Sequence, residues 1–141
     1  MIAAQGLVPL NLDAGRARMQ LAAMMAYLHQ ILATKRVDEE QFHAIFLDAG
    51  RGYLDDCRMG AGHAAHMPIR LRELFAKALS LGARGIIVAH NHPSGDCHPS
   101  ECDIAATRRL AEIGRALDIE LLDHLIVTPE KVYSMRAGGK L

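Results

Sequence analysis

The chain has 141 residues, half of them hydrophobic and 23% charged, a composition that predicts one soluble globular domain with a single core. Basic and acidic residues number 16 each, so the formal net charge is zero. This balance does not favour an anionic membrane or nucleic acid as a partner, and aromatic residues, at 4%, are too few for a base-stacking surface. We therefore expect nucleic-acid binding to be weak or absent.

The cysteine content and the hydropathy pattern predict a cytoplasmic protein. The three cysteines, Cys57, Cys97 and Cys102, are an odd number without a framework spacing, which favours a reducing compartment and no structural disulfide. No apolar run reaches the ~18 residues of a membrane-spanning helix. The N-terminus lacks the basic segment and apolar core of a signal peptide.

The first half of the chain predicts a helix followed by a hairpin. Residues 1–12 lack periodicity and are expected to be a flexible lead-in to a domain at 13–141. Asn11 or Asp13 is expected to cap a helix that runs to about residue 32. Its apolar residues recur at helical spacing, namely Leu21, Met24, Met25, Leu28 and Ile31. A strand at 42–47, a turn at 48–52 and a strand at 53–58 should follow.

The second half alternates helices with strands. The predicted elements are, in chain order, a loop at 60–67, a helix at 69–81 capped by Gly82, a strand at 85–89, a helix at 100–117, and strands at 119–122, 125–127 and 132–135. Because the two kinds of element interleave, the fold class is α/β or α+β. We expect a mixed β-sheet flanked by helices.

Residues 90–103 carry the strongest chemical pattern in the chain. His90 and His92 end an apolar run, and residues two apart on an extended chain point to the same side. Both imidazoles can therefore meet one metal ion. The alternative interpretation is two loop histidines beside a turn.

Asp103 strengthens the metal hypothesis. Ser100 and Asp103 have the spacing of a capping box, which would give both residues a purely structural role. The helix also has an apolar stripe, predicted at Ala106, Leu110, Ile113 and Leu117. Asp103 begins this inward-facing stripe, where an unpaired carboxylate is costly. Two histidines and one carboxylate, with a fourth position left for water, are a ligand set of hydrolytic zinc sites.

This segment resembles the motif of the JAMM (MPN+/JAB) metalloproteases, in which His-x-His is followed by seven residues, Ser, two residues and Asp. The loop His-Asn-His-Pro-Ser-Gly-Asp at 90–96 resembles the RadC branch of that family more closely. The same branch is matched at residues 40–48, 72–73, 107–110, 122–127 and 133–134, although Leu71 stands where the family has proline. The resemblance covers roughly residues 20–139. It implies a single domain with the cytidine-deaminase-like JAMM fold, without the helix-hairpin-helix region of full-length RadC proteins.

The resemblance implies a zinc ion held by His90, His92 and Asp103, with water as the fourth ligand. It also implies a general base at Glu40, which opens the first strand, and an oxyanion donor at Ser100. Glu40 is one of three consecutive acidic residues, so a solvated acidic cluster is the alternative. Glu73 is a second candidate for the base.

Other residues leave further metal sites open. Cys97 and Cys102 with His90 could form a competing thiolate site. His63 and His66 could line the rim of a substrate groove or bind a second ion.

Asp123 and His124 match the family, and they either support the site or pair with each other. The sequence thus predicts a zinc-dependent metallohydrolase that acts on a peptide or isopeptide. The alternative is a non-catalytic MPN-like module, associated with DNA repair, that binds a partner or nucleic acid. A homodimer is among the assemblies we consider.

Overall fold

The computed structural model describes residues 12–33, 38–62 and 70–141. The elements are, in chain order, α1 (Leu12–Ala33), β1 (Glu40–Leu47), β2 (Tyr53–Gly62), α2 (Leu71–Ser80), β3 (Gly85–Asn91), α3 (Glu101–Ala116), β4 (Glu120–Val127) and β5 (Val132–Ser134). In these ranges no helix is both long and apolar enough to cross a membrane.

The strands form one mixed sheet in the order β2-β1-β3-β4-β5, which confirms the predicted fold class. β1 is antiparallel to β2 and β3, and β5 is antiparallel to β4. β3 and β4 are parallel. A parallel pair needs a long crossover, and α3 supplies it. The carboxyl end of β3 therefore leads, through the loop 92–100, into the N-terminus of α3.

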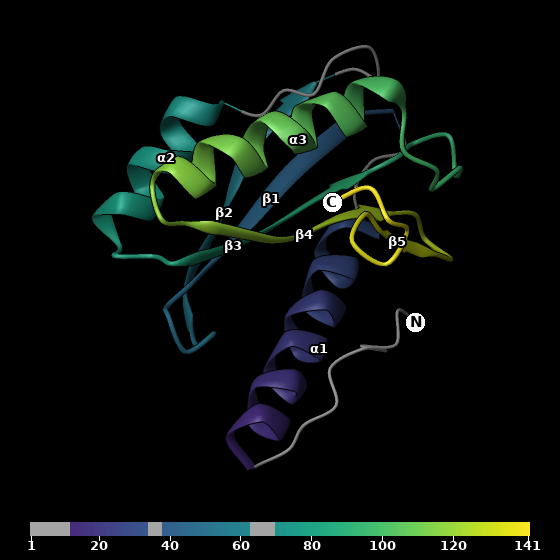
Figure 1. The fold of residues 1–141 in the computed structure, drawn as a ribbon. Coiled ribbons are helices and arrows are strands. Elements are labelled where there is room, and N and C mark those ends of the chain that lie inside the picture. Colours follow the sequence, from purple (N-terminus) through teal and green to yellow (C-terminus); the bar gives the residue numbers. More distant parts are fainter. Residues whose placement is uncertain (1–11, 34–37, 63–69) are drawn as a thin grey trace.

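Helices cover both faces of the sheet, with α2 and α3 on one side and α1 on the other (Figure 1). Side chains alternate between the two faces along a strand, and helices cover both faces. The central strands β1 and β3 are therefore buried on both sides. The core on the α2 and α3 side includes Phe42, Phe46, Leu74, Phe75, Val88 and Leu110. The core on the α1 side includes Met24, Leu28, Leu32, Ile45, Ile87 and Leu125.

Several predicted element boundaries were wrong. Glycine-rich residues 60–62 continue β2 rather than forming a loop, because they pair with the start of β1. The strands predicted at 119–122 and 125–127 are one strand, β4, which pairs with β3 along its whole length. Asp13 lies inside α1, whose first residue is Leu12. Asn11, the lead-in and residues 63–67 of the predicted loop lie outside the described residues.

The inward face of α3 also differs from the prediction. The buried residues are Asp103, Thr107, Leu110 and Gly114. Leu117, predicted to face inward, is 38% exposed. The prediction stepped three residues along the helix from Asp103, whereas the buried stripe steps four, to Thr107. The inward stripe therefore begins with two polar residues, Asp103 and Thr107, rather than with Asp103 alone.

Gly114 allows α3 to approach the start of β4. A Cβ atom built on Gly114 would lie 2.4 Å from the carbonyl oxygen of Ile119, a backbone atom that cannot easily move. Helix propensity alone predicts that alanine is better than glycine there by about 1 kcal/mol. The close contact should outweigh this gain, since overpacking costs roughly 1–3 kcal/mol.

We predict that Gly114→Ala lowers the free energy of unfolding by up to about 2 kcal/mol, measured by urea denaturation. Glu112→Ala, at an exposed position of the same helix, is the control and should change stability by less than about 0.5 kcal/mol. A Gly114→Ala variant more stable than the wild type would show that α3 does not pack this closely.

Candidate metal centre

The end of β3 brings two histidine rings together. His90 lies inside the strand and His92 just after it, where the His92 amide still donates to the carbonyl of Val127. The extended backbone turns both rings to the side of the sheet that α3 covers. Their Nε2 atoms are 3.0 Å apart. His90 is fully buried, whereas the His92 side chain is 11% exposed.

Asp103 reaches the histidines from the first turn of α3. Its Oδ2 lies 3.0 Å from the Nε2 of His92, and its Oδ1 lies 3.4 Å from the Nε2 of His90. The Oδ2 also accepts a hydrogen bond from the Ser100 amide at 2.8 Å, and the Ser100 hydroxyl accepts one from the Asp103 amide at 3.0 Å. The capping box and the contacts with the histidines therefore coexist on one carboxylate.

Glu40 completes the cluster from the first residue of β1. Glu40, His90 and His92 each offer a ligand atom, and these atoms lie within 4.8 Å of one another. Glu40 is only 5% exposed, so the structure places it with the histidines rather than in a solvated acidic cluster.

Asn91 holds the two strands in register at this point. Its side chain accepts from the Gln41 amide at 2.7 Å and donates to the Glu39 carbonyl at 3.0 Å. These bonds flank Glu40 on both sides along β1. Two residues further on, the ring of Phe42 stacks on His90 with centroids 4.6 Å apart. The start of β1 is thus fixed against the end of β3.

The hydrogen bonds of His92 determine which ring nitrogen faces the site. Its Nδ1 lies 2.7 Å from the carbonyl oxygen of Asp96, which can only accept. The Nδ1 therefore carries a hydrogen. In the neutral ring the Nε2 then has a lone pair, and this atom faces Asp103.

Electrostatics separates the pKa values of the clustered groups. Burial raises the pKa of Glu40. For Asp103, the effect of burial is outweighed by its hydrogen bonds with His90 and His92, which hold the pKa well below its usual range. Burial would lower the pKa of His92, but the hydrogen bonds with Asp103 and the Asp96 carbonyl raise it overall. Burial dominates for His90 and lowers its pKa.

The sequence left the roles of Asp123 and His124 open, and the structure separates them. Asp123 bonds Ser134 and accepts from the amide of Arg136 at 3.1 Å. The Nε2 of His124 lies 2.7 Å from the Nδ1 of His90, so His124 supports the cluster from behind.

Thr107 was missed by the sequence analysis. Its hydroxyl lies 2.6 Å from the Nδ1 of His124, and all of its surface is buried. Its position four residues after Asp103 is the signal that could have identified it, because residues four apart share a helix face.

The remaining candidates lie apart from this cluster. Glu73 is exposed on α2 and pairs with Arg70 at 3.2 Å. Cys97 and Cys102 are free thiols, and the group of facing ligand atoms in the described part of the chain consists of Glu40, His90 and His92. His63 and His66 lie outside the described residues.

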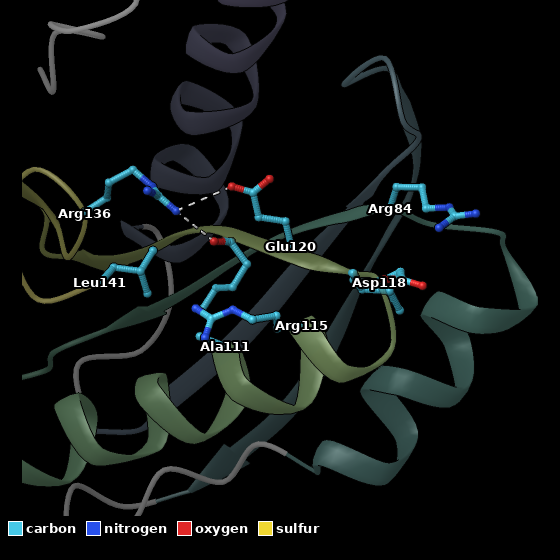
Figure 2. Close-up of a pocket in the computed structure, with 9 residues that line it drawn as sticks. Arg84, Ala111, Arg115, Asp118, Glu120, Arg136 and Leu141 are labelled. Carbon is cyan, nitrogen blue, oxygen red and sulfur yellow. Dashed lines mark hydrogen bonds and ion pairs between the residues drawn. The ribbon is translucent and has the colours of Figure 1, made fainter.

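A hollow lies at the other end of α3 (Figure 2). This cavity, of about 590 Å³, is lined by Arg84, Arg115 and Arg136 together with Asp118 and Glu120. Arg136 donates to the Leu121 carbonyl at 3.0 Å and lies 3.9 Å from Glu120, so part of its charge is already compensated. About 18 Å of helix separates Arg115 from Asp103. The cavity is therefore distinct from the histidine cluster.

Comparison with known proteins matches one family domain to most of the chain. The model of the RadC-like JAB domain matches residues 19–140. The UPF0758 protein of Rhodobacter capsulatus is 38% identical over 119 residues, which are 84% of this chain and 55% of that protein. The UPF0758 protein of Roseiflexus castenholzii is 39% identical over 132 residues, or 92% of this chain and 56% of that protein. The chain spans about half the length of these curated relatives.

The pKa directions of three histidines predict how the stability of the metal-free protein depends on pH. Burial lowers the pKa of His90 and His124, so below about pH 6.5 the unfolded chain binds up to two more protons than the folded one. Stability should then fall by up to about 2.7 kcal/mol per pH unit on acidification. The raised pKa of His92 has the opposite effect. Protonated His92 stabilises the folded protein, and this stability is lost as the pH rises through the pKa of His92 in the folded state.

Chelator-treated protein unfolded by urea between pH 5.5 and pH 8 would test this prediction. His124→Gln should roughly halve the slope below about pH 6.5, because one of the two buried histidines is gone. An acid slope that is the same in this variant would contradict the assignment.

Proposed function

We propose that this chain, which belongs to the RadC-like JAB domain family, is a zinc-dependent hydrolase that cleaves an amide bond in a peptide or isopeptide. One observation carries the proposal. Three acceptor groups, the Nε2 atoms of His90 and His92 and the carboxylate of Asp103, lie 3.0–3.4 Å from one another beside a buried glutamate. A cation is what such a group of facing lone pairs requires.

The spacing of the acceptors supports zinc. Zinc binds nitrogen and oxygen at about 2.0–2.2 Å and prefers tetrahedral geometry. Tetrahedral ligand atoms at these distances are about 3.3–3.6 Å apart. The separations in the cluster are 3.0–3.4 Å, so a small outward shift of the side chains would accommodate the ion. Imidazole nitrogens with one carboxylate are also a donor set that zinc prefers.

The fourth coordination position, which a zinc ion held by three side chains would leave for water, would give this site its chemistry. When bound with one position open, zinc lowers the pKa of a coordinated water towards ~7. Glu40 has the position and the electrostatics to move the proton. Its carboxylate takes a proton from the attacking water and delivers it to the nitrogen of the leaving amine. Burial raises the pKa of Glu40, which makes its carboxylate a stronger base than an exposed one.

Ser100 stands at the rim of the cluster and is exposed. Its hydroxyl oxygen accepts from the Asp103 amide, and this bond leaves the hydroxyl hydrogen available. The hydroxyl can therefore donate to a substrate carbonyl oxygen, where negative charge develops during attack. His92, also partly exposed, lies on the same side, so the substrate approaches over the loop between β3 and α3.

We predict about one zinc ion per chain in the wild-type protein, measured by elemental analysis after dialysis against zinc-containing buffer. His92→Ala should lose most of this zinc, because it removes one of three protein ligands. His98→Ala is the matched control, since His98 lies on the same loop with its side chain 80% exposed and should not affect zinc content. Unchanged zinc in His92→Ala would reject the ligand assignment.

We predict that Glu40→Gln retains zinc and folds normally but hydrolyses substrate about 10²–10⁴-fold more slowly, because an amide cannot accept the proton. The assay uses a library of fluorogenic linear peptides and lysine isopeptides. Glu73→Gln, an exposed carboxylate outside the cluster, should hydrolyse like the wild type.

Activity in Glu40→Gln equal to the wild type would remove Glu40 from the reaction. If the zinc-loaded wild type cleaves no member of the library, the non-catalytic binding module becomes the better description.

A further inference from the structure

We infer that Thr107 and His124 are positioning residues that fix the tautomer of His90, so that the Nε2 lone pair of His90 points into the metal centre. The inference rests on the proposed function for its purpose, because a zinc ligand needs that lone pair. Its evidence is a continuous chain of buried hydrogen bonds from the backbone of α3 to His90. Thr107, His124 and His90 all have no exposed surface.

The direction of the chain is set at Thr107. Its hydroxyl oxygen lies 2.6 Å from the carbonyl oxygen of Asp103, one turn earlier in α3. A carbonyl oxygen cannot donate, so the single hydroxyl hydrogen must lie between these two oxygens. The same hydroxyl is 2.6 Å from the Nδ1 of His124. Since the hydroxyl hydrogen is already used, Thr107 must accept here, and the Nδ1 of His124 carries a hydrogen.

The proton position then passes to the second histidine. The His124 ring is fully buried, and its two nitrogens face His90 and the Thr107 hydroxyl, neither of which carries a negative charge. An imidazolium buried without an opposite charge is costly, so the ring is neutral and carries one hydrogen. With that hydrogen on Nδ1, the Nε2 is an acceptor. It lies 2.7 Å from the Nδ1 of His90. A hydrogen must lie between these two nitrogens, and only His90 can supply it.

His90 is therefore left with a hydrogen on Nδ1 and a lone pair on Nε2. The Nε2 is the atom that lies 3.0 Å from the Nε2 of His92 and 3.4 Å from Asp103. The opposite tautomer would place its hydrogen in the metal position and would leave two lone pairs facing each other between His90 and His124. Stacking of Phe42 against His90 keeps the ring plane fixed while the chain selects the tautomer.

The tautomers of the two histidine ligands are thus fixed by separate hydrogen-bond partners. The carbonyl of Asp96, in the loop, selects the tautomer of His92. A relay that begins at the Asp103 carbonyl selects the tautomer of His90. Asp103 itself contributes its side chain to the cluster and its backbone to the relay. The first two turns of α3 therefore orient two ligands, Asp103 and His90. A substitution at Thr107 should change the tautomer of His90, although two hydrogen bonds separate the residues.

Nitrogen-15 NMR of the metal-free protein near neutral pH tests the inference directly, because it reports which ring nitrogen carries the hydrogen. We expect Nδ1–H on both His90 and His124 in the wild type. Thr107→Val removes the acceptor for His124 at nearly constant volume. In this variant we expect His124 to move its hydrogen to Nε2, which forces His90 to the Nε2–H tautomer. Zinc affinity should fall about 10–100-fold, as is typical when a residue that orients a ligand is lost.

Two further variants separate positioning from folding. Thr107→Ser keeps the hydroxyl and should restore both the wild-type tautomers and the zinc affinity. Thr128→Val changes another buried threonine, one whose hydroxyl bonds the Lys131 backbone, and should change neither. A stability loss in Thr107→Val alone, with wild-type tautomers and zinc affinity, would overturn the inference.

The readouts also keep this inference apart from the proposed function. Nε2–H on His90 in the wild type would refute the relay even if zinc binds and peptides are cleaved. Correct tautomers in a protein that binds no zinc would instead refute the proposed function and leave the relay in place.

Discussion

The structure depends on three acceptor groups held face to face at the carboxyl end of β3. His90, His92 and Asp103 present two lone pairs and a carboxylate within 3.0–3.4 Å of one another, and they do so with little exposure to water. Such an arrangement is unfavourable unless a cation lies among the groups. In the metal-free protein a proton on His92 can take this role, which is why contact with Asp103 raises the pKa of His92 against the effect of burial.

The fold supplies each part of this arrangement from a different element. The parallel pairing of β3 with β4 requires the crossover helix α3, and the crossover brings Asp103 to the histidines. β1 lies on the other side of β3 and brings Glu40 to the same end of the sheet. β4 carries His124 beneath His90. The site is thus a product of the strand order, and a register slip in either neighbour of β3 would separate its components.

The sequence predicted which residues gather at the end of β3 better than it predicted the residues packed around them. The spacing of His90, His92, Ser100 and Asp103 is local, so alternation along a strand and the capping pattern were enough to place them on one side. Glu40 is 50 residues from His90, and only the family resemblance indicated it. The spacing of Thr107 from Asp103 was enough to place it on the inward face of α3, but its contact with His124 was not predictable, because that contact depends on how deeply α3 packs against β4. The close approach at Gly114 sets that depth, and no periodicity in the sequence reveals it.

The central claim is that the facing lone pairs of His90, His92 and Asp103 hold one metal ion. The most direct measurement is anomalous diffraction at the zinc edge from crystals of the zinc-loaded protein. The account predicts one peak per chain, bonded to the Nε2 atoms of both histidines and to a carboxylate oxygen of Asp103, with Glu40 beside the open position. A peak bound instead through Nδ1 of His90, or by the thiolates of Cys97 and Cys102, would contradict it, as would a site that stays empty at saturating zinc.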